Sequence, residues 1–387
     1  MPSTCEFQLN NSNAVYYSGE VVSGAIVLKT LFAKDVRDIR LIFRGEGKVS
    51  WTETESRKHS DGTRTNESVN FIANEVYMDN TTTVHDEGIL RPGTYTYRFE
   101  IPLPEETPTA CEGRYGHIRY ILALMLRRPS CFDNTFSKPL TVIKSQDLNL
   151  NPDFRIPIVT ENIVNSCCWS CLSGNINTIL KVPFGGYAIG QRVKFSVIIQ
   201  NHSMTDIHSY TIEFIRRMTF TARSPHQRRR HDLTILHTKI YDNRCKPWTM
   251  SNFDGDFPIV STPPSTEGDS ILRVGYSLKV TFHMGGFSAN NNNNSLSLPI
   301  FIGDVPLRES FVTSEDMESD RFIDAAPTAP ELFSDDPDLP PSYQELCPPS
   351  FEEAIRSGSP FIDIDKDEHN RHIGFRPLYP MYSQSDD

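Results

Sequence analysis

The chain has 387 residues, of which 38% are hydrophobic, and a formal net charge of −11. This length suffices for two domains and further segments, and no run of residues approaches the ~18 consecutive apolar positions of a membrane-spanning helix. Basic and aromatic residues interleave too thinly for a nucleic-acid-binding surface, so we expect no nucleic-acid partner.

The N-terminal residues and the cysteines together indicate a cellular compartment. The first ten residues, MPSTCEFQLN, lack the charged-then-apolar layout of a signal peptide. Eight cysteines in a chain of this length, without an export signal, are expected to be reduced thiols. We therefore expect a cytoplasmic protein.

Alternating apolar and polar residues predict antiparallel strands through most of the chain. Residues 38–43, DIRLIF, place Ile39, Leu41 and Phe43 on one face, and residues 192–200, RVKFSVIIQ, show the same period of two. Turn-forming stretches such as RPGT and PFGG separate the strands, and no capped helical pattern competes with them. The fold class is predicted to be all-β.

Two halves of this strand-rich region match each other. A shift of 171 residues places Gly19-Glu20 on Gly190-Gln191 and aligns Val22 with Val193, Ile26 with Val197, Leu28 with Ile199, Leu41 with Ile212 and Phe43 with Phe214. At a shift of 155, TPTACEG (107–113) matches TPPSTEG (262–268); one residue later in register, Ile118, Tyr120, Leu122 and Leu124 fall on Val274, Tyr276, Leu278 and Val280. Turns and strands that match in the same order indicate two copies of one β-sandwich.

This repeat suggests a division of the chain. Residues 1–148 are predicted to form the first sandwich and residues 166–305 the second, joined by a polar, proline-bearing linker at 149–165. Residues 306–387 carry 19 of the 49 acidic residues but only 6 of the 38 basic ones. Such a segment, poor in aliphatic residues, cannot bury enough apolar area to offset its chain entropy. We expect an acidic, disordered tail, apart from small docked pieces.

The order of these motifs resembles the arrestin fold. The first sandwich carries GTYTYRFEIPLPEETPTACEGRYGHIRYILALMLRRP (93–129), and the second carries GGYAIGQRVKFSVIIQNHS (185–203) and closes with LPIFIGDVPL (298–307). With a PPxY-bearing tail and RPLYPMY (376–382), the chain is similar to the alpha-arrestins, also called arrestin domain-containing proteins. The resemblance implies two tandem arrestin-like antiparallel β-sandwiches. It also implies a non-catalytic adaptor that engages membrane receptor or transporter cargo and recruits ubiquitin ligases through its tail.

One tail motif, Pro340-Pro341-Ser342-Tyr343, predicts a partner. Pro340 and Pro341 favour a polyproline II ridge, which the aromatic groove of a WW domain binds at little ordering cost. Tyr343 supplies a ring and a hydroxyl for a second slot, and Leu346 adds an apolar contact one turn further on. We expect a WW-domain, HECT-type ubiquitin ligase to bind here; the alternative is a chance cluster in a proline-rich tail.

A second copy of this motif, Pro348-Pro349-Ser350-Phe351, keeps the ring but lacks the hydroxyl. The lost hydrogen bond is worth roughly 0.5–1.5 kcal/mol, or about a 2- to 13-fold loss of affinity. Pro348, Pro349 and Phe351 are therefore either a weak auxiliary site for a ligase with tandem WW domains or a decayed copy.

A third tail motif, Pro327-Thr328-Ala329-Pro330, resembles the tetrapeptide that the ubiquitin-E2-variant domain of the ESCRT-I budding complex binds. Ala329 and Pro330 would fill a pocket of that domain, and Thr328 would add a polar contact. The motif indicates either ESCRT-I recruitment or a chance match of four residues.

Two further features of the sequence are candidate ion-binding sites. A basic run contains Arg228, Arg229 and Arg230. One interpretation is that these arginines contact phosphate, either on lipids or on a phosphorylated receptor tail. The alternative is that they belong to a solvated strand pair with a charged loop. Cys168 and Cys171 form a CxxC, but a structural zinc site needs two further ligands, and His208 or Cys245 is a poor substitute. We predict no metal and no cofactor.

Two rival functional classes stay open beside the adaptor. No nucleophile elbow, phosphate loop or His-Glu metal motif is present, although an enzyme site assembled from distant strands would leave none. A sorting or scaffold subunit that works through its sandwiches alone would remain active without residues 306–387. The adaptor itself is expected to be cytoplasmic and to reach the plasma membrane and endosomes through its partners.

Overall fold

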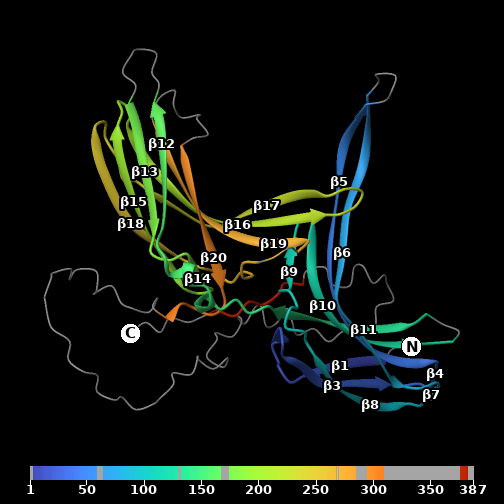
Figure 1. Ribbon diagram of the computed structural model, residues 1–387. Coiled ribbons are helices and arrows are strands. Elements are labelled where there is room, and N and C mark those ends of the chain that lie inside the picture. Colours follow the sequence, from blue (N-terminus) through green and yellow to red (C-terminus); the bar gives the residue numbers. More distant parts are fainter. Residues whose placement is uncertain are drawn as a thin grey trace, which may run out of the picture.

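The computed structural model describes residues 3–58, 64–129, 132–166, 174–266, 268, 270–284, 294–308 and 375–381. Strands dominate this part of the chain (Figure 1). Two complete 3₁₀ turns, η1 (Leu148–Leu150) and η2 (Pro152–Arg155), lie within these ranges. No helix in the described ranges has the length and apolar character needed to cross a membrane.

The first sandwich is made of the strands up to residue 143. Its smaller sheet has the order β1-β3-β8, its larger sheet the order β2-β11-β10-β5-β6 with β9 paired to β10, and β4 pairs with β7 beside them. The bounds are β1 (Ser3–Leu9), β2 (Val15–Tyr17), β3 (Val21–Thr30), β4 (Lys34–Val36), β5 (Asp38–Lys58), β6 (Arg64–His85), β7 (Gly88–Leu90), β8 (Gly93–Pro102), β9 (Cys111–Gly113), β10 (Gly116–Arg127) and β11 (Asn134–Ile143).

The second sandwich has one sheet of order β12-β13-β15-β18 and one of order β14-β20-β19-β16-β17. Its strands are β12 (Ile158–Ser166), β13 (Gly174–Val182), β14 (Gly186–Ala188), β15 (Arg192–His202), β16 (Ile207–Ala222), β17 (Arg228–Tyr241), β18 (Thr249–Pro258), β19 (Leu272–Met284) and β20 (Ser295–Gly303). Alternate residues of strands such as β15 and β19 are buried, as the period of two predicts.

The two sandwiches are copies of one topology, which confirms the predicted all-β fold and its repeat. Both carry a short parallel strand at one edge, β2 on β11 and β14 on β20, in the same sheet position. The pairing registers agree as well: Leu41 lies opposite Leu124, and Ile212 lies opposite Val280. These partners are related by the shifts of 171 and 156 residues at which the sequence halves match.

The turn before β3 and the turn before β15 have the same backbone conformation and the same hydrogen bond. Gly19 and Gly190 both have positive φ, 88° and 94°, a conformation that side-chain-bearing residues rarely adopt. The next residue in each turn, Glu20 or Gln191, accepts a hydrogen bond from the backbone N–H three positions earlier, at 2.7 and 2.8 Å. The Gly19-Glu20 and Gly190-Gln191 match therefore reflects one turn geometry used twice.

The structure corrects the predicted domain boundaries. Residues 158–166, largely within the predicted linker 149–165, form β12 and pair antiparallel with β13. This strand lies at the sheet edge and leaves Val159 and Ile163 exposed, so its sequence lacks a clear apolar face. Leu307 is fully buried, so the second sandwich continues beyond 305. Residues 309–374 lie outside the described ranges.

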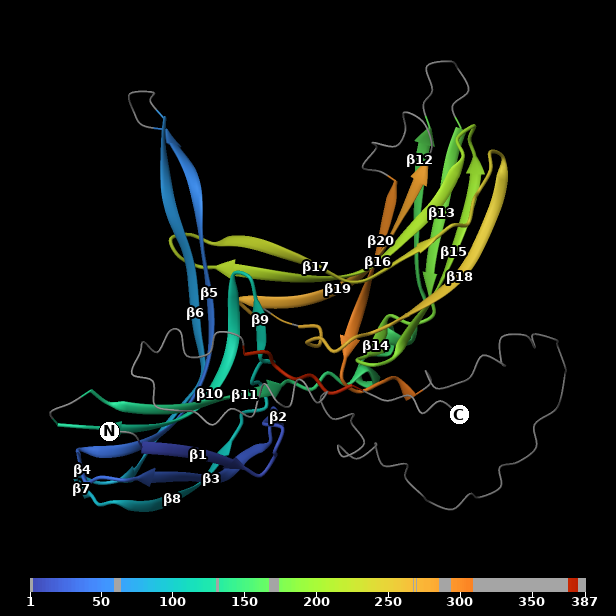
Figure 2. The ribbon, with the colours of Figure 1, turned by 180° about the vertical axis from the view of Figure 1, so that it is seen from behind.

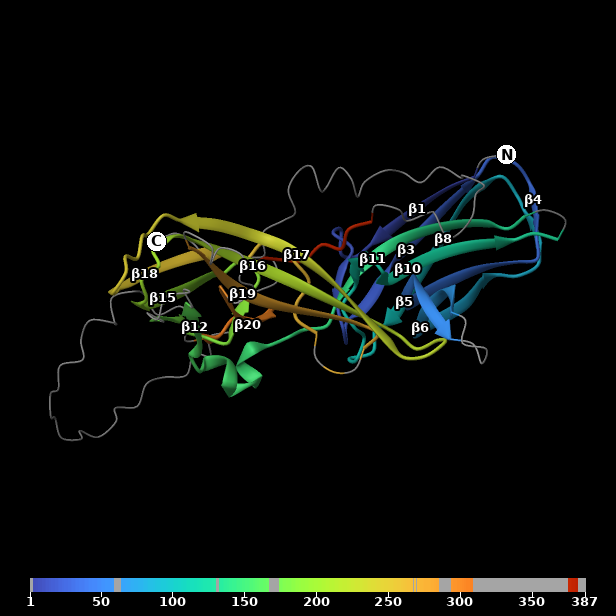
Figure 3. The same ribbon diagram turned by 90° about the horizontal axis from the view of Figure 1, so that it is seen from above.

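The two sandwiches stand side by side, and strands of the second reach the first. Figure 2 shows β16 and β17 running from the second sandwich to the long β5–β6 hairpin and β19 running to β9 and β10, and Figure 3 shows the same crossing from above. β16 contacts both β5 and β6, and β19 contacts β10. The sandwiches therefore share a junction. On the side of the first sandwich it consists of β5, β6, β9, β10 and the segments 104–110 and 144–148; on the side of the second it consists of β16, β17, β19 and the segment 259–266.

Candidate functional site

The junction contains backbone pairing between the two sandwiches. Ile72 of β6 accepts hydrogen bonds from the N–H groups of Arg223 and Ser224, at 3.0 and 3.1 Å, and donates to the Ser224 carbonyl at 3.0 Å. Residues 223–224 form the start of the turn between β16 and β17. The turn of one sandwich thus pairs with a strand of the other.

Aromatic side chains fill the space behind this pairing. Phe71, which is fully buried, packs perpendicular to the His226 ring at a centroid distance of 5.1 Å. Tyr115 and the fully buried Phe220 pack edge to face at 5.5 Å. The Arg230 guanidinium lies 4.1 Å from the centre of the Tyr115 ring, a cation–π contact.

In the ion pairs and the histidine contact that join the two sandwiches, the first sandwich supplies the carboxylates, and the second supplies arginines and a histidine. The pairs are Glu75 with Arg223, Glu55 with His226 (3.5 Å), and Glu53 with both Arg228 (3.3 Å) and Arg230 (3.9 Å). Because these pairs are partly exposed, each is worth about 0.2–1 kcal/mol. Their charge complementarity therefore determines the relative orientation of the two sandwiches more than it adds to the stability of the contact.

A second contact lies where the first sandwich runs into the second. Asp304, after β20, accepts hydrogen bonds from the Ser145 hydroxyl at 2.9 Å and from the Gln146 backbone N–H. Burial raises the pKa of Asp304, and the hydrogen bonds oppose that rise. The carboxylate is buried and orders the 145–147 segment against the end of the second sandwich.

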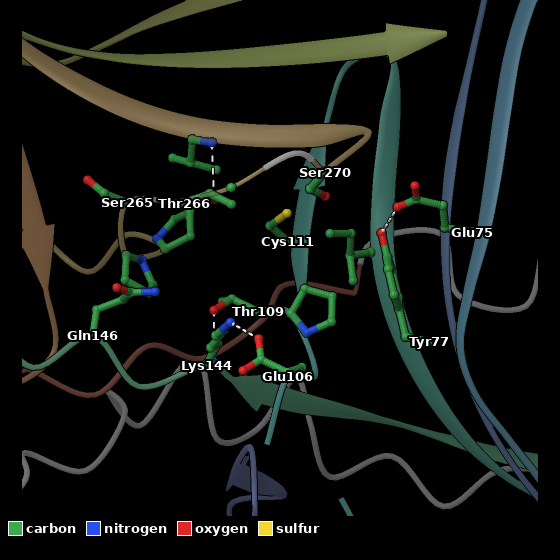
Figure 4. A pocket seen from close by; sticks show the side chains of 16 residues that line it. Glu75, Tyr77, Glu106, Thr109, Cys111, Lys144, Gln146, Ser265, Thr266 and Ser270 are labelled. Atoms are coloured by element: carbon green, nitrogen blue, oxygen red, sulfur yellow. Dashed lines mark hydrogen bonds and ion pairs between the residues drawn. The ribbon is translucent and has the colours of Figure 1, made fainter. Parts of the chain in front are cut away.

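A cavity of about 280 Å³ lies between these contacts, and Figure 4 shows its walls. Tyr77 and Cys111 come from the first sandwich, and Ser265 and Thr266 from the second. The Tyr77 hydroxyl donates to Glu75 at 2.8 Å, and the Lys144 ammonium pairs with Glu106 at 2.5 Å. The charged groups on the wall are therefore engaged with one another.

The thiol in this cavity is held in its neutral form. Cys111 is almost fully buried, and burial raises the pKa of its thiol to about 12, with the neighbouring Glu112 adding to the rise. The thiolate is the nucleophilic and metal-binding form of cysteine. The arrangement thus favours packing and binding over covalent chemistry at Cys111.

The C-terminal residues 375–381 also lie at the junction, drawn in red in Figures 1 and 2. Tyr379 donates a hydrogen bond to the Ala110 carbonyl at 2.8 Å, and its own carbonyl accepts one from the Ser261 hydroxyl at 2.9 Å. The sequence interpretation assigned no role to Tyr379. The available signal was RPLYPM, a proline-flanked apolar cluster in an otherwise acidic and polar tail.

The predicted site residues fall into two groups. Arg228 and Arg229 lie exposed on β17, and Arg230, beside them, is half buried; whether they contact phosphate stays a prediction. The WW, ESCRT-I and CxxC motifs lie outside the described residues; they comprise Pro340, Pro341, Tyr343, Leu346, Pro348, Pro349, Phe351, Pro327, Thr328, Ala329, Pro330, Cys168 and Cys171. Within the described ranges, no three His, Cys, Asp or Glu side chains gather as a metal ion would require.

Comparison with known proteins matches both sandwiches. Residues 5–149 match the family model described as arrestin (or S-antigen), N-terminal domain, and residues 172–307 match the arrestin C-terminal domain. Arrestin domain-containing protein 17 of Caenorhabditis elegans is 26% identical over 313 residues, covering 78% of this chain and 70% of the relative. Human arrestin domain-containing protein 4 is 25% identical over 95% of this chain and 81% of its own length. Human thioredoxin-interacting protein is 24% identical over 89% and 84%, respectively.

Proposed function

This chain belongs to the arrestin family, among the alpha-arrestins or arrestin domain-containing proteins, and we propose that it is a trafficking adaptor that links membrane cargo to a WW-domain, HECT-type ubiquitin ligase. The observation that carries the proposal is the combination of a two-sandwich arrestin body with Pro340-Pro341-Ser342-Tyr343 in the acidic segment that follows it. One part would hold the cargo and the other would bring the ligase.

The junction supports the first half of this proposal. Backbone pairing through Ile72, aromatic packing at Phe71 and Phe220, and the paired charges join the sandwiches along an extended contact. Two sandwiches held in one orientation present their loops to a binding partner as a single preorganised surface. That surface is where we place receptor or transporter cargo, with membrane association through these partners.

The tail supports the second half. Pro340 and Pro341 bias the backbone toward the conformation that a WW groove binds, and Tyr343 completes the motif. A ligase recruited there would ubiquitinate cargo held by the body and promote its endocytosis and sorting. The protein would work in the cytoplasm and be recruited to the plasma membrane and endosomes. Recruitment of ESCRT-I through Pro327–Pro330 would add a role in vesicle budding.

The test is affinity capture with the full chain, using Tyr343→Ala as the variant and Phe351→Ala as the matched control. The wild-type chain and the Phe351 variant should retain WW-domain ligases, and Tyr343→Ala should lose them. Ubiquitination of co-captured membrane proteins should fall with the ligase. Equal ligase capture by all three forms would rule out recruitment through this motif.

A sorting subunit that acts through the folded body alone is the second candidate, favoured by the extent of the junction. Removal of residues 309–374 would leave such a protein fully active in cargo sorting, whereas the adaptor would lose ligase-dependent sorting. An enzyme is the least supported class, because the charged groups on the cavity wall are paired and the Cys111 thiol is neutral.

A further inference from the structure

Residues 375–381, FRPLYPM, contact both sandwiches at once. The Leu378 N–H donates to the Thr141 hydroxyl at 3.1 Å and Tyr379 donates to the Ala110 carbonyl at 2.8 Å, both in the first sandwich. The Ser261 hydroxyl, from the second sandwich, donates to the Tyr379 carbonyl at 2.9 Å. Two consecutive residues thus bridge the two bodies.

The Tyr379 side chain is the buried part of this contact. Tyr379 and Met381 pack against the hydrophobic core, and although the Tyr379 residue as a whole is partly exposed, its hydroxyl lies inside. Burial, together with the nearby Cys111 and Tyr276, raises the pKa of Tyr379 well above its usual value. A buried phenol whose hydroxyl donates to a backbone carbonyl indicates a specific binding site for the tyrosine side chain.

The flanking residues suit a segment that docks reversibly. Pro377 and Pro380 limit the backbone on either side of Tyr379, so less conformational entropy is lost when the segment is ordered. Arg376 is exposed and is not part of the buried contact. The contact is short and depends on one ring and a few hydrogen bonds, which limits its affinity.

We propose that the junction of the two sandwiches is a peptide-binding site for a proline-flanked tyrosine, and that residues 375–381 of the same chain are its ligand. The segment acts as a clip that ties the first sandwich to the second. It also returns the chain to the body, so that residues 309–374 join two fixed points.

Covalent linkage makes this ligand hard to displace. A tethered segment experiences an effective concentration of about 1 mM, so a peptide affinity near 10 µM would keep the site about 99% occupied. A free peptide would then bind the wild-type chain about 100-fold more weakly than a chain whose own segment cannot dock.

The experiment uses the full chain and a fluorescent synthetic peptide of residues 375–381. Fluorescence anisotropy should show binding to the Tyr379→Ala chain, weak binding to the wild-type chain, and equally weak binding to Arg376→Ala, the matched control. A peptide with phenylalanine in place of tyrosine should bind the Tyr379→Ala chain about 2- to 13-fold less tightly, since only the hydrogen bond to Ala110 is lost. Adding Ser261→Ala and Thr141→Val to the Tyr379→Ala chain should weaken peptide binding further.

Amide hydrogen exchange of the same chains provides a second readout. In the wild-type chain, the Leu378 amide should be protected, and Tyr379→Ala should remove that protection and increase exchange at Ile72 and Ser224. Absence of peptide binding to the Tyr379→Ala chain would overturn the proposal. Unchanged exchange at Leu378 in that chain would overturn it as well.

Discussion

Tyr120 and Tyr276 make the same hydrogen bond in the two sandwiches. Tyr120 donates its phenolic hydrogen to the Pro108 carbonyl at 2.5 Å, and Tyr276 donates to the Pro263 carbonyl. Both prolines follow the threonine of the TPTACEG and TPPSTEG segments. Each ring is buried, and burial raises the pKa of both phenols. The repeated sequence thus encodes a buried anchor between a strand and the turn beside it.

Replacing these tyrosines with phenylalanine should destabilise the protein unequally. Tyr120→Phe removes one bond and should lower the free energy of unfolding by about 0.5–1.5 kcal/mol. Tyr276→Phe should cost about 1–3 kcal/mol, because the Tyr276 hydroxyl also bonds to the buried Thr262 hydroxyl at 2.8 Å. Urea unfolding of each variant measures the difference. A smaller effect for Tyr276→Phe would contradict this account.

Stability should fall in mildly alkaline solution because of two buried thiols. Burial raises the pKa of Cys5 and Cys111 to about 12 from an ordinary value near 9. Their contribution is complete below pH 9 and is lost as the pH rises toward 12, since only the unfolded chain ionises in that range. Between pH 9 and 10 each thiol should remove about 1 kcal/mol of stability. Urea midpoints across this range should change less steeply with pH in Cys111→Ala than in the wild type.

Neutralising Glu53 tests the phosphate interpretation of the β17 arginines. Glu53→Gln releases Arg228 and Arg230 from their carboxylate partner. An arginine near an anionic surface contributes about 1 kcal/mol, so binding should become about 5-fold tighter for each arginine that reaches the surface. Co-sedimentation with anionic vesicles at low salt measures the change, and Glu55→Gln, which loses a histidine partner instead, is the control. The wild type, Glu53→Gln and an Arg228/Arg229/Arg230 triple alanine variant are compared. If all three bind vesicles equally, these arginines do not contact lipid phosphate and act only in the contact between the sandwiches.

Restoring the hydroxyl to the second proline motif should strengthen it. A peptide of residues 345–354 carrying Phe351→Tyr should bind a single WW domain about 2- to 13-fold more tightly than the native peptide. Calorimetry against one WW domain and then against a tandem pair separates an auxiliary site from a decayed copy. In the full chain, Phe351→Ala should weaken binding only to the tandem pair.

Pro330→Leu tests recruitment of ESCRT-I. If Ala329 and Pro330 fill a pocket, this substitution should abolish binding of the ubiquitin-E2-variant domain and leave WW-domain binding intact. Surface plasmon resonance with the full chain measures both on one sample. Binding of that domain at unchanged affinity would make the tetrapeptide a chance match.

The sequence was sufficient for the sandwiches but not for their junction. The 171-residue match found Gly19 with Gly190 and Leu41 with Ile212 because φ > 0 turns and buried strand positions restrict residue type locally. The pairing of Glu53 with Arg228 depends on side chains that meet only after both sandwiches have folded, so no local pattern records it. β12 lies at an exposed sheet edge, so its sequence lacks the one apolar face by which a strand is recognised. Tyr379 binds a backbone carbonyl, and a backbone carbonyl has no sequence signature.

The order in which the chain is synthesised gives the junction a kinetic consequence. The last strand of the first sandwich ends at Ile143, whereas the hairpin that covers its Phe71 is complete only at Tyr241. At about 5–20 residues per second, those 98 residues take roughly 5–20 s to emerge from the ribosome. During that time the first sandwich can fold while an aromatic face stands uncovered. Until the second sandwich has formed, chaperone binding and self-association therefore compete for the exposed aromatic face of the nascent chain. Folding of the second sandwich covers this face and ends the competition.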